Sequence, residues 1–499
     1  MELQFQTNEL TCLKRLTGET QTREETQEVK ISDGMPDIGR VLCAWGQYVI
    51  RGKEWRTGSA GVNGGVTVWV LYAPDDGSQA QCVQSWIPMN FQWDIPETPE
   101  DGQLMCHPLV RSVDARPTSG RKLMIRATVG MLAQTYIPHT ITWHSPGQLP
   151  EQVYIKENVY PFCLLRDMGE KAFIIDEELV VPESAPGLEK LIRYSLQPKV
   201  EESKVLGDKA IFRGNTLVHV LYRTVDGGFA TWDFDVPFSQ YSQLAEPYSE
   251  EAKVQVFPLL TAAEMDAGEQ GRLRLKAGVT GQYMVYDTQR IPAVEDAYSP
   301  ERDVKIMPYT LEVPAVLENQ AQRIRGEQTA PFGSSQMVDI AFYPGCCRTQ
   351  RKTDQMIFEI PGIFQSLYYD EDGVLQVQTV SWQDTITHGV AENADIDGIC
   401  QADGTPQSSM GDDSTTFRGE VILHTVATAD QPVTAATGLN IGDVFEKDPK
   451  RPSVVLRRPD GESLWSLAKQ HGSTEKLIRE VNQIEDGSEN DNVLLIPVL

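Results

Sequence analysis

The chain has 499 residues, too many for one domain of roughly 100–200 residues, so we expect about three or four domains. Asp and Glu (71) outnumber Lys and Arg (44), and the formal net charge is −27. This charge argues against broad binding to nucleic acid or anionic lipid, because both need clustered positive charge. With 40% hydrophobic and 23% charged residues, the composition is that of a globular protein.

No targeting segment is visible in the sequence. Residues Met1–Thr7 lack the basic and apolar regions of a signal peptide, and no stretch approaches the about 20 consecutive apolar residues of a membrane span. The eight cysteines are scattered and form no Cys-x-x-Cys pair. Such usage is typical of reduced thiols in the cytosol. We therefore expect a cytoplasmic protein without a disulfide framework.

Three segments share a pattern in which Leu-Tyr is followed, after three residues, by Asp-Gly. They are Leu71–Gly77, Leu221–Gly227 and Leu367–Gly373, at offsets of 150 and 146 residues. Asp-Gly between extended runs is a strong hairpin signal, because glycine adopts positive φ without a steric penalty. The alternating run before the first copy, Val66–Tyr72, has apolar residues on both faces, as a buried strand needs.

The first two copies align beyond the hairpin. Pro36 aligns with Pro186, and Leu123–Val129 aligns with Leu273–Val279, at the same offset. The apolar residues after each proline have helical spacing, so we expect a short helix there. The third copy keeps the hairpin and a closing strand around Phe417–Val426, whereas its beginning does not align.

These patterns predict a mainly β protein, built of tandem sandwich-like or small-barrel modules and followed by a different C-terminal domain. We expect a first repeat over 1–150, a second over 151–310, a divergent third over 311–430, a linker over 431–452 and the C-terminal domain over 453–499.

The C-terminal domain has the pattern strand, helix, helix, strand. After the extended run Val454–Leu456, Ser463 is placed to cap a helix with an apolar stripe that ends at Gly472. Ser473 or Thr474 caps a second helix, and Val493–Pro497 forms the closing strand. This domain resembles LysM. Gly461–Ala468 resembles the family's G-D-T-L-W-x-I-A signature, Asn482 its helix-ending asparagine, and residues 493–497 its closing strand.

The order of β repeats with Leu-Tyr-x-x-x-Asp-Gly, then Lys450–Ser453, then a LysM-like domain resembles the SPOCS/SipL family of spore-coat morphogenesis proteins. The resemblance implies a non-enzymatic scaffold in the mother-cell cytoplasm that is recruited to the forespore surface and the spore coat. It further implies that the LysM-like domain binds the SpoIVA-type coat ATPase. Other coat proteins are further expected partners.

Trp465 is the first candidate for partner binding. It lies about 100° around the helix from Leu464, off the apolar stripe, and a large aromatic beside an apolar edge strand is typical of an interface anchor. The alternative is that Trp465 packs against the linker or the second helix. The predicted partner-binding residues are Trp465, Val455, Leu456 and Glu462.

An alternative function is that of a cell-wall protein whose LysM-like domain binds peptidoglycan glycan containing N-acetylglucosamine. The expected lack of an export signal counts against it. The resemblance implies a glycan groove lined by Asp460, Gly461, Ser463, Ile484, Glu485 and Asp486.

We identify no catalytic, metal or cofactor site in the sequence. His139 and His144 lack a third ligand, and Cys346-Cys347 has no metal-ligand spacing. Asp370–Gly373 lacks the alternate oxygen ligands of a calcium loop. Phosphate-binding and nucleophile-elbow motifs are absent. We therefore expect no enzyme activity, no cofactor and no nucleic-acid partner.

Overall fold

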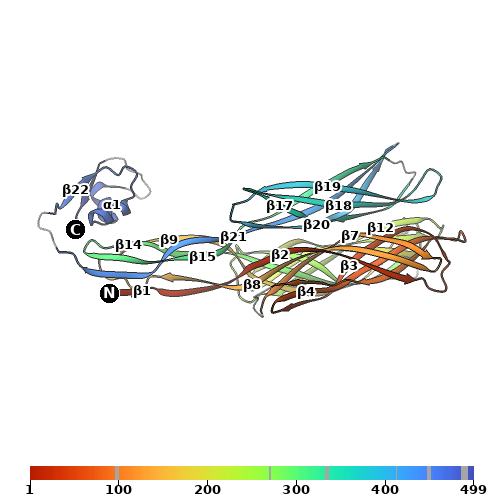
Figure 1. The fold of residues 1–499 in the computed structure, drawn as a ribbon, viewed down its shortest axis with the longest axis horizontal. Helices are drawn as coiled ribbons and strands as arrows, with labels where there is room; N and C mark the ends of the chain where they lie inside the picture. The colour runs from red at the N-terminus through yellow and green to blue at the C-terminus, as the bar shows by residue number, and fades with distance from the viewer. Residues whose placement is uncertain (96–100, 269–270, 332–335, 412, 447–450, 485–492) are drawn as a thin grey trace.

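The computed structural model describes residues 1–95, 101–268, 271–331, 336–411, 413–446, 451–484 and 493–499. It is a long molecule with three parts (Figure 1). A broad β head forms one end, a narrow stalk of long strands extends from it, and a small C-terminal module lies against the far end of the stalk. The prediction of a mainly β protein is confirmed.

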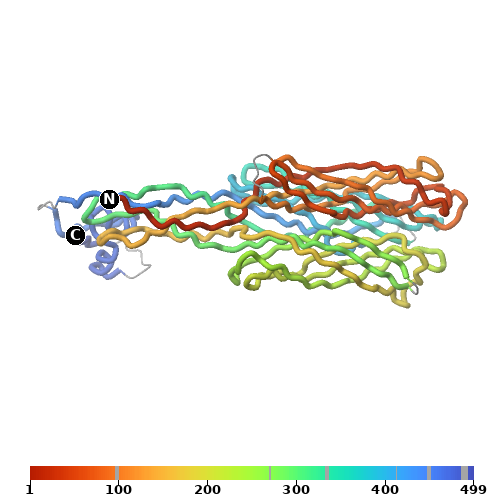
Figure 2. Tube along the Cα trace, turned by 90° about the horizontal axis from the view of Figure 1, so that it is seen from below, coloured from red at the N-terminus to blue at the C-terminus, as the bar shows by residue number. Residues whose placement is uncertain are grey.

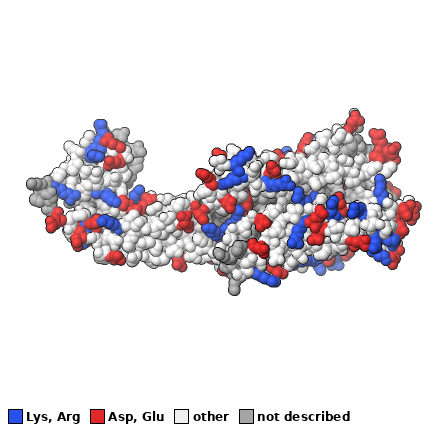
Figure 3. All heavy atoms as spheres, in the orientation of Figure 1, with Lys and Arg blue, Asp and Glu red and all other residues white. Residues whose placement is uncertain are grey.

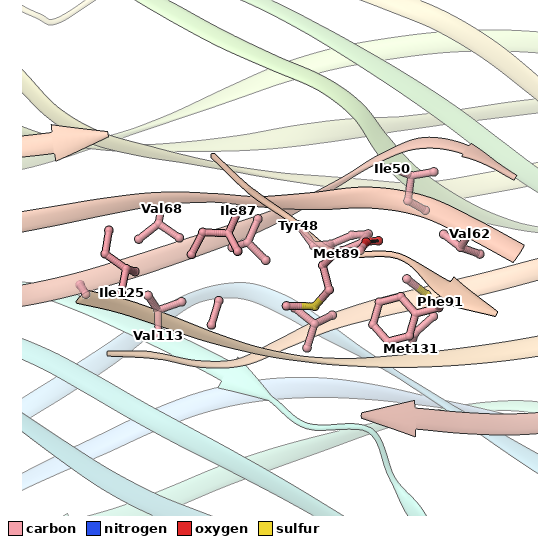
Figure 4. Packing of buried hydrophobic residues seen from close by; sticks show 14 of the residues in the cluster. Tyr48, Ile50, Val62, Val68, Ile87, Met89, Phe91, Val113, Ile125 and Met131 are labelled. Atoms are coloured by element: carbon pink, nitrogen blue, oxygen red, sulfur yellow. Dashed lines mark hydrogen bonds between the residues drawn. The ribbon is translucent and has the colours of Figure 1, made fainter. Parts of the chain in front are cut away.

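Repeat 1 consists of two antiparallel sheets that face each other. One sheet has the order β2-β8-β7 and the other the order β3-β4-β5, with β6 also paired to β4. Apolar residues from both sheets fill the space between them (Figure 4). The strands are β2 (Gln6–Lys30), β3 (Ile38–Arg56), β4 (Ser59–Pro74), β5 (Gln81–Pro88), β6 (Phe91–Asp94), β7 (Gln103–Ser119) and β8 (Lys122–Ser145).

Repeats 2 and 3 follow the same strand order. Repeat 2 pairs β9-β14-β13 and β10-β11-β12, and repeat 3 pairs β15-β21-β20 and a meander around β18. Repeat 2 has β9 (Tyr154–Val180), β10 (Leu188–Leu206), β11 (Lys209–Thr224), β12 (Phe229–Gln243), β13 (Lys253–Ala267) and β14 (Arg272–Tyr298). Repeat 3 has β15 (Arg302–Ala330), β16 (Gln336–Pro344), β17 (Arg348–Lys352), β18 (Gln355–Tyr369), β19 (Leu375–Gly389), β20 (Asp395–Met410) and β21 (Thr415–Val444).

The boundaries expected around repeat 3 need correction. Although the beginning of this repeat does not align in sequence with the other copies, β15 takes the place of β2 and β9 there. This strand runs across the expected boundary between residues 310 and 311, and β21 continues to Val444, so residues 431–444 are strand rather than linker. The short β1 (Glu2–Gln4) pairs with this part of β21. Long-range pairing with β15 and β1 holds these residues extended although their local sequence lacks a strong strand signal.

The helix expected after Pro36 and Pro186 is wrong, because both segments are strands. The register of β3 against β4 shifts between Ile38 and Arg40 and again before Cys43, and β10 shifts at the equivalent places. Each shift is a bulge or irregularity that inserts a residue into the strand. Inserted residues change the spacing of inward-facing side chains from two to three, which imitates the helical period.

The repeats pack side by side around a common axis rather than in a row. In Figure 2 the lobes of repeats 1, 2 and 3 (red to orange, yellow to green, and cyan to blue) form one head. Buried clusters contain residues of all three repeats, including Leu71 with Leu221 and Leu367 near the hairpins, and Cys12 with Phe162 and Leu311 in the stalk. Residues of all three repeats are therefore packed together both in the head and in the stalk.

The repeated Leu-Tyr pair has two separate roles. The leucines Leu71, Leu221 and Leu367, at most 1% exposed, meet in the shared core. The tyrosine stays in its own lobe: the Tyr72 hydroxyl donates to the Pro36 carbonyl at 2.9 Å, and the Tyr222 hydroxyl donates to Pro186 at 3.0 Å. The motif thus joins the lobes through leucine and fixes the start of the meander through tyrosine.

The residue opposite each motif leucine differs among the repeats. Cys43 pairs with Leu71, Arg193 with Leu221, and Asp339 with Leu367. The Arg193 Nη2 and Nε atoms donate to Asp339 Oδ2 at 2.6 and 3.1 Å, and the two side chains are only 4% and 1% exposed. The equivalent position is therefore a thiol in repeat 1, a cation in repeat 2 and an anion in repeat 3.

His219 extends this ion pair into a network between repeats 2 and 3. Its Nε2 lies 2.9 Å from Asp339 Oδ1 and its Nδ1 lies 2.5 Å from Asp233 Oδ1. Burial alone would lower the pKa of His219, but the hydrogen bonds that its ring makes to the Asp233 and Asp339 carboxylates outweigh burial and raise it. Burial acts to raise the pKa of Asp339, yet Arg193 and His219 hold it well below its usual range.

We predict that Asp339→Ala destabilises the protein by about 3–5 kcal/mol, because it leaves Arg193 buried without its partner. The double variant Arg193→Leu/Asp339→Leu should recover most of this loss, since two apolar side chains leave no charge unpaired. The midpoint of thermal unfolding measures both effects. Equal losses in the single and double variants would contradict this account.

A second contact among the repeats uses aromatic rings. His107 of β7 and Phe257 of β13 are equivalent residues, each followed by proline, and their ring centroids lie 4.9 Å apart. Phe257 also meets the edge of His424 of β21 at 5.2 Å. Burial lowers the pKa of His107 to about 3, with a smaller effect from His424, and lowers the pKa of His424 to about 4.

We therefore predict that acidification from pH 6.5 to 5 destabilises the protein. The unfolded chain binds protons at these histidines near their usual pKa of about 6.5, whereas the folded chain does not. Stability then falls by on the order of 1.4 kcal/mol per pH unit for each histidine. His107→Phe, which copies repeat 2, should flatten the pH dependence of the unfolding midpoint. An unchanged slope in this variant would contradict the assignment.

Candidate partner-binding surface

The C-terminal module consists of β22 (Val454–Arg457), α1 (Leu464–His471), α2 (Glu475–Asn482) and β23 (Leu494–Pro497). The two strands pair in antiparallel register. The Ser463 hydroxyl accepts the Ser466 N–H at the start of α1, and Gly472 ends this helix with a positive φ of 64°. The Thr474 hydroxyl, rather than that of Ser473, caps α2 by accepting the Leu477 N–H. This is the element order that the sequence predicts.

Trp465 joins the module to the stalk. Its indole N–H donates to Asp296 Oδ2 of β14 at 2.8 Å. Its ring meets the ring of Tyr298 edge to face, with centroids 4.7 Å apart and planes at 80°. Tyr298 is itself buried in one cluster with the module residues Leu467 and Ile478. A residue of the stalk therefore completes the core of the module.

Two polar contacts strengthen this attachment. Lys469 Nζ donates to Asp296 Oδ1 at 2.6 Å, and the Tyr298 hydroxyl donates to the Ser473 carbonyl at 3.1 Å. Burial tends to raise the pKa of Asp296, but the hydrogen bonds from Lys469 and Trp465 outweigh it, so the pKa is lowered. Asp296 is thus an ionised acceptor for both donors at neutral pH.

The structure places Trp465 against the stalk, a neighbour that the sequence did not suggest. The indole also packs on the cluster that includes Ile478 of α2. The ring is half-buried, and partner binding by Trp465 stays a prediction.

Val455 and Leu456, predicted together as an apolar edge, lie on opposite faces of β22. Val455 is half-buried against the core of the module, whereas Leu456 is 70% exposed. Val454, on the same face as Leu456, is 44% exposed. Alternation along a strand explains the difference. The outer face of β22 is therefore one exposed apolar surface of the module, besides Val481, Val493 and Leu499.

Four of the six predicted groove residues lie in the described part of the module, and two do not. Asp460 and Gly461 have positive φ (47° and 83°) in a turn that is closed by the Glu462 N–H donating to the Pro459 carbonyl at 2.8 Å. Glu462 pairs with Arg457 at 3.3 Å. Ser463 serves as a helix cap, and Ile484 packs on the core of the module. Glu485 and Asp486 lie outside the described residues, so the glycan groove stays a prediction.

Charge near β22 differs from that of the whole chain. Residues 451–458 include three arginines (Arg451, Arg457 and Arg458) and no acidic residue, although the chain carries −27. Figure 3 shows basic and acidic groups together on the face of the module that is turned to the viewer. A local basic segment beside an exposed apolar strand favours an acidic partner.

Cavities lie between the repeats in the part of the chain that the structure describes, and two of them are lined by residues of all three repeats. One, of about 290 Å³, is lined by equivalent segments of β3, β10 and β16, including Gln47, Gln197 and Tyr343. The other, of about 420 Å³, lies where the strands enter the stalk and is lined by Arg15, Leu165 and Val316 among others. Among the described residues, no group of three or more His, Cys, Asp or Glu side chains is arranged to hold a metal ion.

Residues 188–264 match the family described as SipL, SPOCS domain. The matched segment contains β10, β11, β12 and most of β13, which are the meander and the adjoining strand of repeat 2. The match supports a SipL-like protein with a role related to sporulation. No curated protein and no solved structure matches the chain. None of the helices in the described ranges is long and apolar enough to cross a membrane.

We predict that Trp465→Ala releases the module from the stalk, because it removes both the ring contact with Tyr298 and the hydrogen bond to Asp296. Trp465→Phe keeps a ring but loses the N–H donor, so its effect should be smaller, about 1 kcal/mol in docking free energy. Small-angle scattering should show a larger radius of gyration for Trp465→Ala. The same scattering curve for Trp465→Ala and the wild type would contradict this prediction.

Proposed function

We propose that this protein is a non-enzymatic scaffold in endospore coat assembly. It acts in the mother-cell cytoplasm, binds the SpoIVA-type coat ATPase through its LysM-like C-terminal module, and links the coat to the forespore surface. Its mechanism is binding alone. The head and stalk supply a stiff body, and the module supplies the surface that captures the partner.

The match of residues 188–264 to the SipL SPOCS domain carries this proposal. The same strand order recurs in repeats 1 and 3, so the matched unit is one of three similar units. The module that follows them has the strand–helix–helix–strand order of LysM. The arrangement of three SPOCS-like units and one LysM-like module is the one that the SipL resemblance implies.

The position of the module supports a role in capture. It lies at the end of the stalk, away from the lobes of the head (Figure 1). A large partner can therefore approach it without meeting the head. The attachment through Asp296 and Tyr298 fixes the orientation of the module, so the exposed Leu456 and the neighbouring Arg457 and Arg458 are presented together.

We expect Leu456→Glu to weaken capture of the SpoIVA-type ATPase by about tenfold or more, because a buried apolar anchor is replaced by a charge. Leu206→Glu is the matched control, since Leu206 is 62% exposed in repeat 2 at a distance along the chain from the module. Affinity capture with the purified full-length chain measures the difference. Equal capture by the wild type and Leu456→Glu would contradict this surface.

A pull-down on purified peptidoglycan separates the scaffold from the cell-wall alternative. Strong retention of the full-length chain on peptidoglycan, without capture of the ATPase, would reject the proposed function. Capture of the ATPase without retention on peptidoglycan is the expected result.

A further inference from the structure

The C-terminal module contains a sheet of only two strands. Among the described residues, β22 pairs with β23 alone, and β23 pairs with β22 alone. A two-stranded sheet has two outer edges, each with backbone N–H and C=O groups that point away from the partner strand. The two edges of this sheet differ, because one is closed by a side chain.

Asn482 closes the outer edge of β23. Its Nδ2 donates to the Leu495 carbonyl at 2.7 Å, and its Oδ1 accepts the Leu495 N–H at 2.8 Å. Both backbone groups of Leu495 therefore point away from β22. Leu456, which lies opposite Leu495, must belong to the same non-hydrogen-bonded pair.

Hydrogen-bonded and non-hydrogen-bonded residue pairs alternate along an antiparallel pair of strands, and this alternation shows which backbone groups of β22 are unpaired. Because the Leu456–Leu495 pair makes no ladder bonds, the N–H and C=O of Leu456 point outward from β22, as do those of Val454 two residues earlier. Val454 lies opposite Pro497, which has no N–H to donate. The Val498 N–H donates to the Ser453 carbonyl at 3.0 Å, as this alternation requires. Within the described ranges, no other strand covers this edge.

The side chains at this edge indicate the chemistry of an occupant. Val454 and Leu456 present apolar surface on one face. Arg458 lies two residues beyond Leu456, whereas Arg457 is paired with Glu462 and Arg451 donates to the carbonyls of His471 and Leu499. An extended segment with apolar residues at alternate positions and acidic residues beside them would match both features. A second copy of β22 would instead bring two basic segments together, each with three arginines and no acidic residue over 451–458, which like-charge repulsion disfavours.

We propose that the partner adds a strand to the free edge of β22, through an extended acidic segment whose backbone pairs with Val454 and Leu456. For the identity of the partner, this inference rests on the proposed function. Main-chain hydrogen bonds give such a contact affinity, and the exposed valine and leucine give it register. The added strand converts the two-stranded sheet into one of three strands.

A proline substitution tests the backbone contact. Leu456→Pro removes only an outward N–H, so the pairing of β22 with β23 should persist, as proline is tolerated at sheet edges. Leu456→Ala is the matched control, because it removes a similar amount of side chain and keeps the N–H. We expect Leu456→Pro to bind the ATPase at least about tenfold more weakly than Leu456→Ala. Equal affinities would overturn the proposal.

Residue-resolved hydrogen exchange of the full-length chain gives a second readout. In the free protein, we expect fast exchange at the Val454 and Leu456 amides and slow exchange at Val455, whose amide faces β23. Addition of the SpoIVA-type ATPase should slow exchange at Val454 and Leu456. A complex that leaves both amides unprotected would overturn the proposal and leave the proposed function intact.

If no complex with the ATPase forms, the proposed function fails, and a synthetic peptide then decides the inference. The probe is a blocked hexapeptide of alternating Glu and Val, compared with the same peptide N-methylated at alternate residues. Protection of Val454 and Leu456 by the first peptide alone would support strand addition, and protection by neither would overturn it. If the Val454 and Leu456 amides exchange slowly in the protein without any peptide, and the protein is a dimer in solution, the edge is covered by a second copy. That result would also overturn the proposal.

Discussion

The ion pair between Arg193 and Asp339 joins two repeats at equivalent positions, each opposite the leucine of the repeated motif. Three identical charged side chains could not share this buried site, because burial of an unpaired charge is strongly unfavourable. The copies instead carry Cys43, Arg193 and Asp339, which place one cation against one anion. Packing in which either charge lost its partner would be disfavoured. The side-by-side arrangement of the lobes can therefore hold charged side chains at this position only because the repeats differ there.

Local sequence patterns predict the repeat but not its assembly. The Leu-Tyr-x-x-x-Asp-Gly hairpins, their strands and the strand–helix–helix–strand module follow from alternation, turn residues and caps. The bulged starts of β3 and β10 imitate a helix, because inserted residues alter the apolar period. The first strand of repeat 3 lacks a recognisable local match, since its pairing with β21 is long-range. Closure of the lobes around an axis depends on contacts between residues about 150 positions apart, for example that of Gln47 with Leu196.

The candidate site shows the same division. The sequence identifies Leu456 and Trp465 as apolar residues of the module, and the turn at Asp460–Gly461 follows from its composition. The sequence cannot show that Trp465 contacts Asp296 and Tyr298, because these two residues belong to repeat 2 and no motif links them to the module. The sequence also does not show which edge of β22 is free. That follows from the two hydrogen bonds between the Asn482 side chain and the backbone of Leu495. One signal was available: an asparagine that ends a helix shortly before a strand is well placed to bind its backbone.

The long strands give the molecule a mechanical property. At about 3.3 Å per residue, the 30 residues of β21 extend about 100 Å. Strands from all three repeats contribute to two buried clusters along the stalk, so bending would have to break packing in several chain segments at once. The stalk therefore acts as a strut rather than a tether. Bodies held at its two ends would be kept at a set stand-off, and the thickness of any layer built between them would be fixed by strand length.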